Sequence, residues 1–275
     1  MDAIDHGTGW VERWREAFVA DPARALIAVD FDGVLSPIVD DPDRAYALPE
    51  AVQALGGIGP WIGQVAVVTG RPAKDAVRLG RFTEVAGLDR LVVLGQYGVE
   101  RWEARTGEFT IPPAPEAIET LRAELPGVLE SLGLGDLFVE DKGRALGVHT
   151  RAADDPAEAL RRIKAPLEEL AERLGLVTEP GKNVVELRAP GVDKGRTLIE
   201  IVEGMGARSV AYVGDDLGDL AAYDAVESLR DKGIAGLKVY SSSAVTNALA
   251  GRCDLAVQGP PGVARWLRET ARLLS

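Results

Sequence analysis

The sequence predicts an α/β protein in which a doubly wound parallel sheet is interrupted by a smaller inserted domain. Apolar runs of strand length alternate with helical patterns in the first hundred residues and again after residue 190, as parallel strands and their crossover helices do. Between those stretches the order changes to helix, two strands, helix, two strands. We therefore expect a core of residues 1–111 and 189–275 and an inserted α+β (αββαββ) domain over residues 112–188.

Six core strands are predicted from short apolar runs, at residues 25–30, 64–69, 91–94, 209–214, 237–240 and 254–257. Helical patterns lie between them, at residues 50–55, 73–80, 194–204 and 217–225. Pro261 is expected to open a last helix, because proline is favourable in a first helical turn. Before the first strand, an amphipathic helix around Trp10, Trp14 and Phe18 is expected to pack its aromatic side chains on the core.

The inserted domain is predicted from two amphipathic helices and four strands. The first helix is expected to kink at Pro126; the second begins after Asp155 and is expected to bend at Pro166. The strands are expected at residues 137–140, 145–151, 176–179 and 183–188.

One face of the inserted sheet is predicted to be polar. Because side chains two apart on a strand share a face, His149 and Arg151 are expected on one side, and Glu186 and Arg188 share a face as well. Such a face fits a solvated surface and a binding surface equally well.

Charge and composition exclude several classes of function. The 275 residues include 31 Lys and Arg against 43 Asp and Glu, a net charge of −12, which is the wrong sign for a broad surface that binds nucleic acid or an anionic membrane. Cys253 is the only cysteine, so a reducing cytoplasm is the expected compartment. The acidic N-terminus does not resemble a secretory leader, and the apolar runs are too short to span a membrane.

Two carboxylates follow the first predicted strand, in Asp30-Phe31-Asp32-Gly33. Ligands of open α/β sheets bind beyond the carboxyl ends of the strands, so Asp30 and Asp32 occupy a site position. One can attack a substrate while the other moves a proton. Taken alone, Asp-x-Asp-Gly also fits a calcium loop or a plain turn.

Three other strand ends supply groups for a phosphate and a cation. Thr69 and Gly70 offer a hydroxyl and an amide at a helix N-terminus, although Thr69 also fits a helix N-cap. Lys194 opens the helix after the inserted domain and is well placed to pair with an anion. The next strand ends in a cluster of acids whose mutual repulsion favours a bound cation such as Mg²⁺: Asp215, Asp216 and Asp219.

Together, these four strand ends resemble the four motifs of the haloacid dehalogenase (HAD) superfamily of phosphotransferases. The resemblance implies that Asp30 is the nucleophile and forms an aspartyl-phosphate, and that Asp32 is the general acid and base. It also implies three phosphate-binding residues, Thr69, Gly70 and Lys194. The implied Mg²⁺ ligands are Asp30, Asp32, Asp215 and Asp216, with Asp219 as the alternative to Asp216. The inserted domain is similar to the cap of HAD sugar-phosphate phosphatases.

Further motifs are similar to those of the trehalose-6-phosphate phosphatases. They are Asp30-Phe-Asp-Gly-Val-Leu-Ser-Pro-Ile, Thr69-Gly-Arg, Gly95-Gln-Tyr-Gly-Val-Glu100, Glu140-Asp-Lys142, His149-Thr-Arg151, Glu186-Leu-Arg188 and Gly214-Asp-Asp. The resemblance implies Mg²⁺-dependent hydrolysis of trehalose 6-phosphate to trehalose and phosphate, a step of trehalose biosynthesis. It implies that the disaccharide phosphate is bound by four residues of the inserted domain, Lys142, His149, Arg151 and Glu186.

The sequence departs from that family at three positions. Tyr97 stands where histidine is usual, and Gly218 and Leu220 stand where threonine and glutamate are common. Two alternatives therefore stay open: a HAD phosphatase for another small sugar phosphate or pseudo-disaccharide phosphate, such as glycosylglycerol phosphate, and a phosphoacceptor signalling domain without a substrate. The expected partner is a small-molecule sugar phosphate, with no nucleic acid and no membrane. The oligomeric state is left open, and a monomer is compatible with the sequence.

Overall fold

Two compact units make up the chain. The computed structural model describes residues 3–39, 41–181, 183–242 and 249–275. Met1–Ile111 and Val192–Ser275 together form one unit, the core unit, and Pro112–Gly191 forms the other, the inserted unit. The sequence analysis expected the core to resume at residue 189, which is three residues before Val192, where the core unit resumes in the structure. None of the helices among the described residues is long and apolar enough to cross a membrane.

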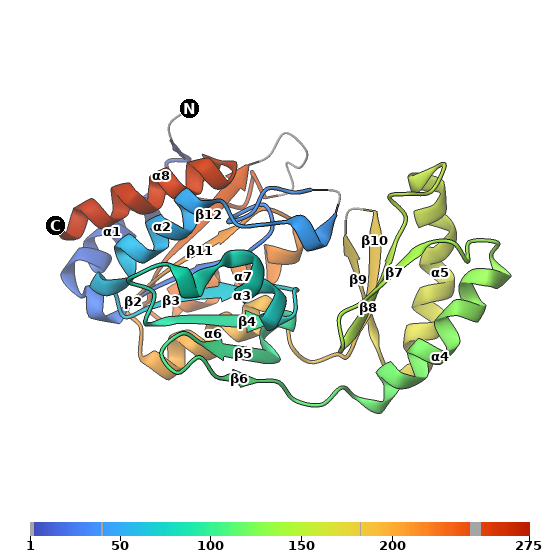
Figure 1. Cartoon of the computed structure of the whole chain (residues 1–275). Helices are drawn as coiled ribbons and strands as arrows, with labels where there is room; N and C mark the ends of the chain where they lie inside the picture. Colours follow the sequence, from blue (N-terminus) through green and yellow to red (C-terminus); the bar gives the residue numbers. More distant parts are fainter. Residues whose placement is uncertain (1–2, 40, 182, 243–248) are drawn as a thin grey trace. The chain divides into compact units, whose positions relative to one another are not determined.

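The core unit is built on one large sheet (Figure 1). Among the described residues its strands lie in the order β1-β13-β12-β11-β2-β3-β4-β5-β6. Their bounds are β1 Ile4–Asp5, β2 Ala25–Val29, β3 Gln64–Val68, β4 Leu91–Gly95, β5 Glu100–Glu103, β6 Phe109–Thr110, β11 Ser209–Gly214, β12 Ala235–Ser242 and β13 Leu255–Gln258. The strands from β13 to β4 are parallel, and β1, β5 and β6 pair antiparallel at the two edges.

The order of the strands creates a switch point between β2 and β11. From β2 the chain moves to β3 and β4 on one side, and after the inserted unit it returns to β11, β12 and β13 on the other. In open α/β sheets, ligands bind at such a reversal, beyond the carboxyl ends of the strands. The residues that follow β2 and β11 are therefore placed where a site is expected.

Alternation along the strands gives the core sheet two buried faces. Ile27 and Val29 lie in the core cluster that includes the apolar residues of α1, α2, α3 and α8, whereas Leu26 and Ala28 lie in the cluster formed with α6 and α7. The helices are α1 Trp10–Ala20, α2 Pro49–Ile58, α3 Ala73–Gly80, α6 Lys194–Met205, α7 Leu220–Asp231 and α8 Gly259–Ala271. Burial on both faces explains why these strands read as continuous apolar runs.

The inserted unit is a second, smaller layered structure (Figure 1). Its antiparallel sheet has the order β7-β8-β10-β9, and α4 and α5 pack on one face of it through a shared apolar cluster. The elements are α4 Glu116–Ser131, β7 Phe138–Asp141, β8 Ala145–His149, α5 Pro156–Leu174, β9 Val177–Gly181 and β10 Val184–Arg188. The Asp155 side chain caps α5 by accepting a hydrogen bond from the Glu158 N–H at 3.0 Å.

The predicted fold class is confirmed, and the differences are local. The six core strands and the αββαββ order of the inserted unit are present, with ends shifted by one or two residues. Both α4 and α5 continue through their prolines, Pro126 and Pro166. The strand expected at 145–151 ends at His149, so the prediction that alternation pairs Arg151 with His149 is wrong; Arg151 lies in the following turn.

Leu167 tests the packing that holds the inserted unit together. Its side chain is fully buried between α5 and the sheet, so Leu167→Ala should lower the free energy of unfolding by about 2–5 kcal/mol. The matched control is Glu168→Ala, because Glu168 is the exposed neighbour on the same helix. Urea unfolding followed by circular dichroism measures both, and equal midpoints for the two variants would contradict the assigned packing.

Candidate active site

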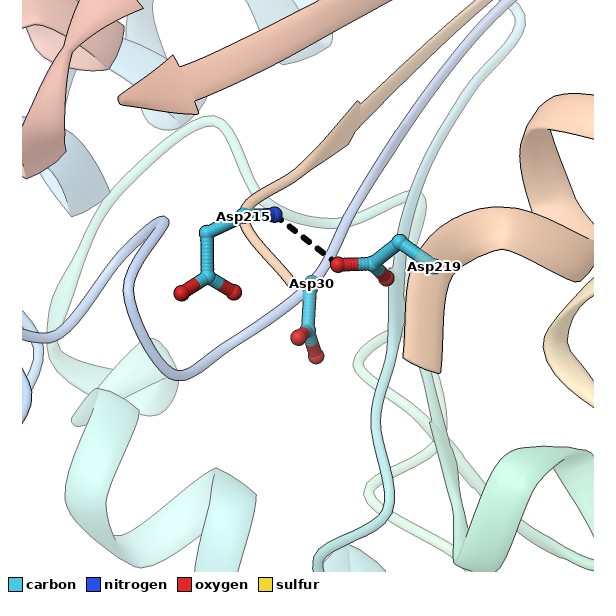
Figure 2. A group of neighbouring side chains, drawn as sticks. All are labelled: Asp30, Asp215 and Asp219. Carbon is cyan, nitrogen blue, oxygen red and sulfur yellow. Dashed lines mark hydrogen bonds between the residues drawn. The ribbon is translucent and has the colours of Figure 1, made fainter. Parts of the chain in front are cut away.

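Two buried carboxylates lie at the switch point of the core sheet. Asp30 follows β2 and Asp215 follows β11, with only 6% and 5% of each residue exposed. The Asp30 N–H donates to the Val213 carbonyl at 2.9 Å, which extends the pairing of the two strands by one residue. Figure 2 shows both carboxylates beside Asp219. The structure therefore brings Asp30 together with two acids that lie 185 and 189 positions further along the sequence.

Lys194 supplies a buried positive charge at this site. As the first residue of α6, it places Nζ 2.8 Å from Asp30 Oδ2 and 2.8 Å from Asp219 Oδ1. Burial alone would lower the pKa of Lys194, but the charges of Asp219 and Asp30 outweigh it, so the pKa lies well above its ordinary value. Lys194 is therefore charged and is fixed against one oxygen of Asp30.

Asp219 is the anchor of the loop that carries Asp215. Its Oδ1 accepts from the Tyr212 hydroxyl at 2.6 Å as well as from Lys194. Its Oδ2 accepts from the Asp215 and Asp216 N–H groups at 2.9 and 3.3 Å. Asp216 completes a capping box at the start of the helical turn Leu217–Asp219. With four donors on its two oxygens, the Asp219 carboxylate is saturated by hydrogen bonds within the protein.

The two acids at the switch point carry more negative charge than Lys194 offsets. Burial raises the pKa of Asp30 to about 8 even though Lys194 lowers it, and burial together with Asp219 and Asp30 raises the pKa of Asp215 to about 10. A second cation would relieve this repulsion and keep both groups ionised.

The donor set fits a divalent metal ion. Asp30, Asp215 and Asp219 each offer an oxygen atom, and these atoms lie within 4.8 Å of one another. Gly33, with φ 71°, leaves room for the Asp215 carboxylate, because a Cβ there would overlap it. Asp219 already accepts from four protein donors, and hard oxygen ligands such as those of Asp30 and Asp215 suit Mg²⁺.

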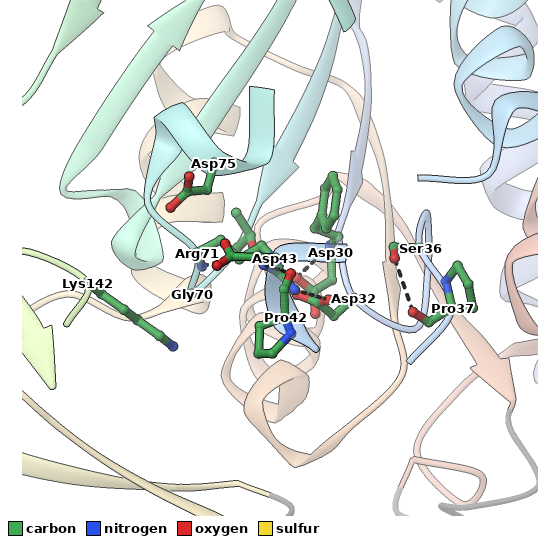
Figure 3. Close-up of polar contacts among 12 residues, drawn as sticks. Asp30, Asp32, Ser36, Pro37, Pro42, Asp43, Gly70, Arg71, Asp75 and Lys142 are labelled. Atoms are coloured by element: carbon green, nitrogen blue, oxygen red, sulfur yellow. Dashed lines mark hydrogen bonds and ion pairs between the residues drawn. The ribbon is translucent and has the colours of Figure 1, made fainter. Parts of the chain in front are cut away.

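Asp32 is held by an arginine that the sequence analysis did not assign. Arg71 donates through Nε to Asp32 Oδ2 at 2.7 Å and through Nη2 to Asp32 Oδ1 at 2.8 Å, and its Nη1 donates to the Pro42 carbonyl at 3.0 Å (Figure 3). A bidentate pair of this kind fixes the direction of a carboxylate as well as its position. The Asp32 side chain is about a third exposed and pairs with Arg71, whereas Asp30 pairs with Lys194.

The segment Thr69–Arg71 is braced by a strained turn. Thr69 is buried, and its hydroxyl accepts from the Arg71 N–H at 3.2 Å. Gln96 and Tyr97 both adopt positive φ, 48° and 63°, and such non-glycine strain persists only where the surroundings enforce it. Here the Tyr97 N–H donates to the Thr69 carbonyl at 2.9 Å, and Gln96 Nε2 donates to the Gly70 carbonyl at 3.1 Å.

The Tyr97 ring lies close to Gly70. A Cβ on Gly70 would lie 3.0 Å from the Tyr97 hydroxyl oxygen and 3.1 Å from the adjoining ring carbon, so the phenol packs directly on the glycine. Tyr97, one of the three residues that depart from the family pattern, therefore packs against Gly70 of the expected phosphate-binding segment.

Three of the predicted residues of the inserted unit lie in one polar cluster with Glu140: Lys142, His149 and Glu186. Lys142 Nζ lies 2.5 Å from Glu186 Oε2, and His149 Nε2 lies 2.9 Å from Glu140 Oε2. Glu186 is buried within the unit, whereas Arg151 is half-buried. The sequence analysis quoted Glu140 in a motif without giving it a role; its spacing from Lys142, two residues further along the chain, was the available signal.

Comparison with known proteins adds the family. A trehalose-phosphatase family profile matches residues 28–258. A trehalose-phosphate phosphatase of Mycobacterium tuberculosis is 31% identical over 205 residues, which cover 72% of this chain and 50% of that protein. The chain thus spans about half the length of the curated relatives it matches.

Solved structures support the fold. The C-terminal domain of a C. albicans trehalose-6-phosphate phosphatase superimposes with a TM-score of 0.76 at 18% identity, over 99% of both chains. A haloacid dehalogenase-like hydrolase from Bacteroides thetaiotaomicron does so with a TM-score of 0.56 at 16% identity, over 89% of this chain and 98% of that one. The HAD-like fold is therefore confirmed, and the family match over most of its length shows that the chain belongs to the trehalose-phosphatase family.

Proposed function

We propose that this chain is a Mg²⁺-dependent phosphatase that hydrolyses trehalose 6-phosphate to trehalose and phosphate through an aspartyl-phosphate on Asp30. Membership of the trehalose-phosphatase family supports the substrate. The observation that carries the reaction type is the buried Asp30 at the switch point, in contact with Lys194 and beside Asp215. The single buried Cys253 is compatible with the cytoplasmic location proposed from the sequence.

Asp30 is oriented for nucleophilic attack by two contacts on different oxygens. Its Oδ1 accepts from the Phe31 N–H at 2.7 Å, and its Oδ2 faces Lys194. The proposed first step is attack by a carboxylate oxygen on phosphorus, which breaks the bond to the sugar oxygen. Lys194, Thr69 and Gly70 are proposed to bind the phosphoryl oxygens, where positioned donors stabilise the charge of the transition state.

The metal ion would be held by Asp30 and Asp215 with Asp216 as the neighbouring acid, and when bound it neutralises phosphate charge. The Asp32 side chain was also expected among the metal ligands, but both of its oxygens pair with Arg71. We therefore propose it for proton transfer alone: it protonates the departing sugar oxygen and then accepts a proton from the water that hydrolyses the aspartyl-phosphate.

Lys142, His149, Arg151 and Glu186 of the inserted unit are proposed to bind the sugar. The alternative within the same chemistry is another small sugar phosphate, since Tyr97, Gly218 and Leu220 depart from the family pattern. A substrate panel decides between them: released phosphate is measured with trehalose 6-phosphate, glucose 6-phosphate and a glycosylglycerol phosphate, each with Mg²⁺ and with EDTA. The proposal expects the highest kcat/KM for trehalose 6-phosphate. A preference for another compound contradicts the substrate, and stoichiometric phosphorylation without turnover contradicts the phosphatase.

Asp30→Asn should lower kcat for trehalose 6-phosphate by roughly 10⁴-fold or more, because the amide cannot form the covalent intermediate. Circular dichroism should show an unchanged fold. Asp231→Asn is the matched control, since Asp231 is an exposed acid at the end of α7, and it should keep wild-type activity. Substantial turnover by the Asp30 variant would remove Asp30 from the nucleophile role.

Asp32→Asn should separate the two chemical steps. With trehalose 6-phosphate, kcat should fall by about 10²–10⁴-fold, because the sugar oxygen needs a proton to leave. With p-nitrophenyl phosphate, whose leaving group needs none, stopped-flow absorbance should show a rapid burst of p-nitrophenolate equal to the protein concentration, followed by slow turnover. Arg71→Met should show the same pattern more weakly, and Arg78→Met, at an exposed arginine of α3, should resemble the wild type. Equal losses on both substrates without a burst would contradict the role of Asp32.

Mg²⁺ should stabilise the protein through the acids at the switch point. At saturation it should raise the Tm by about 5 °C or more, and Asp215→Asn should abolish the increase. Because burial raises the pKa of Asp30 to about 8 and that of Asp215 to about 10, protons compete with the metal below these pH values, and the apparent affinity should rise with pH from about 6 to about 10. Differential scanning fluorimetry measures both effects. A Mg²⁺ response that persists in Asp215→Asn would place the metal elsewhere.

A further inference from the structure

Two residues of one turn bind all three carbonyl groups of the expected phosphate-binding segment. The Tyr97 N–H donates to the Thr69 carbonyl at 2.9 Å, and the Gln96 N–H donates to the Arg71 carbonyl at 2.9 Å. Between these two contacts, Gln96 Nε2 donates to the Gly70 carbonyl at 3.1 Å. Two of the donors belong to the backbone, and the third is the buried side chain of Gln96, to which the chemistry of the reaction assigns no role.

These contacts fix the peptide planes on both sides of Gly70. In a planar trans peptide, a carbonyl and the N–H that follows it point in opposite directions. Since the Thr69 carbonyl points to Tyr97, the Gly70 N–H points away from Tyr97. Since the Gly70 carbonyl points to Gln96, the Arg71 N–H points away from Gln96, and it donates to the Thr69 hydroxyl at 3.2 Å.

The Gly70 N–H is oriented but is left available for a ligand. Gly70 is half-buried, and no residue in the described part of the chain accepts from its N–H. A glycine has more backbone freedom than any other residue, so an N–H at this position keeps one direction only if both neighbouring peptide planes are held. The Tyr97 N–H holds the first plane, and the Gln96 side chain holds the second.

The turn that carries Gln96 is strained and is tied to the helix of Lys194. Gln96 and Tyr97 have φ values of 48° and 63°, a conformation that is uncommon for residues other than glycine. Thr197 of α6 donates through Oγ1 to the Tyr97 carbonyl at 2.5 Å. Gly98, with φ 117°, permits this approach, because a Cβ there would lie 2.1 Å from Thr197 Oγ1. The same turn therefore contacts the segment of Gly70 and the helix that begins at Lys194.

We propose that Gln96 is a positioning residue for phosphoryl transfer. Its side-chain amide holds the Gly70 carbonyl and thereby keeps the Gly70 N–H in the direction in which it binds a phosphoryl oxygen. Donors that are oriented before the reaction stabilise the transition state more than the bound substrate. The role rests on the proposed function for the reaction type, but it is independent of the sugar, because Gln96 acts through Gly70 on the phosphate alone.

Gln96→Met tests the side-chain contact, because methionine has a similar length and no donor. Isothermal titration calorimetry with Mg²⁺ measures the binding of orthovanadate, an analogue of the five-coordinate transition state, and of inorganic phosphate. The Kd for vanadate should rise about tenfold and the Kd for phosphate by less than about threefold. The kcat for p-nitrophenyl phosphate should fall in parallel with the vanadate affinity, and the Tm should stay within about 3 °C of the wild type.

Three further variants separate positioning from a loss of packing. Gln96→His restores an N–H donor in a residue that tolerates positive φ, and it should recover most of the vanadate affinity. Gln53→Met is the matched control, since Gln53 is an exposed glutamine of α2, and it should bind both anions as the wild type does. Thr197→Val keeps the shape of the side chain but removes the hydroxyl that holds the turn, so it should weaken vanadate more than phosphate.

The ratio of the two Kd values decides the outcome. Unchanged affinities in Gln96→Met, or an equal weakening of vanadate and phosphate, would overturn the role of Gln96, as would a wild type that does not bind vanadate. If Gln96→Met does not fold, Thr197→Val decides in its place, and unfolding of both variants would assign these side chains to stability instead. If the wild type binds vanadate but does not hydrolyse trehalose 6-phosphate, the proposed substrate fails, and the vanadate comparison still tests Gln96.

Discussion

The ion pairs of Lys194 with Asp30 and Asp219 hold the catalytic end of the sheet together. All three side chains are almost fully buried, and isolated charges at this depth cost several kcal/mol each. Lys194 satisfies one oxygen of each acid. The other oxygen of Asp219 then fixes the N–H groups at the start of the loop after β11. A single cation therefore positions both the proposed nucleophile and the carboxylate proposed for the metal, from three segments that meet only in the folded chain.

This arrangement explains how a chain with a net charge of −12 can meet an anionic substrate. The acids at the switch point do not simply repel the anionic substrate. Burial raises the pKa values of Asp30 and Asp215, and this makes the binding of a cation favourable there. The phosphate would then meet Lys194 and a metal rather than bare carboxylates. Arg71 neutralises Asp32 in the same region through a bidentate pair. Local pairing, and not the overall charge, sets the potential at the site.

The core and the strand-end acids could be predicted because they depend on local patterns. Buried parallel strands read as apolar runs, and the carboxyl ends of parallel strands lie at the same edge of a sheet, where ligands bind. The antiparallel strands β5 and β6 were missed because Glu100–Glu103 is polar and Phe109–Thr110 is very short. The pair of Arg71 with Asp32 joins two loops through side-chain directions, which no periodicity encodes. The four hydrogen bonds that Asp219 accepts could not be predicted either. One donor is the Tyr212 hydroxyl, and the sequence pattern identifies Tyr212 only as part of a strand.

Chemical trapping of the phosphorylated residue tests the central claim most directly. The protein is mixed with trehalose 6-phosphate and Mg²⁺, quenched, and reduced with borohydride, which converts an aspartyl-phosphate to homoserine. Trypsin then releases the peptide of residues 25–44, which contains both Asp30 and Asp32, for fragmentation by mass spectrometry. The account predicts homoserine at position 30, dependent on substrate and metal. Homoserine at position 32 or 215, or substrate turnover with no trapped acid anywhere, would contradict it.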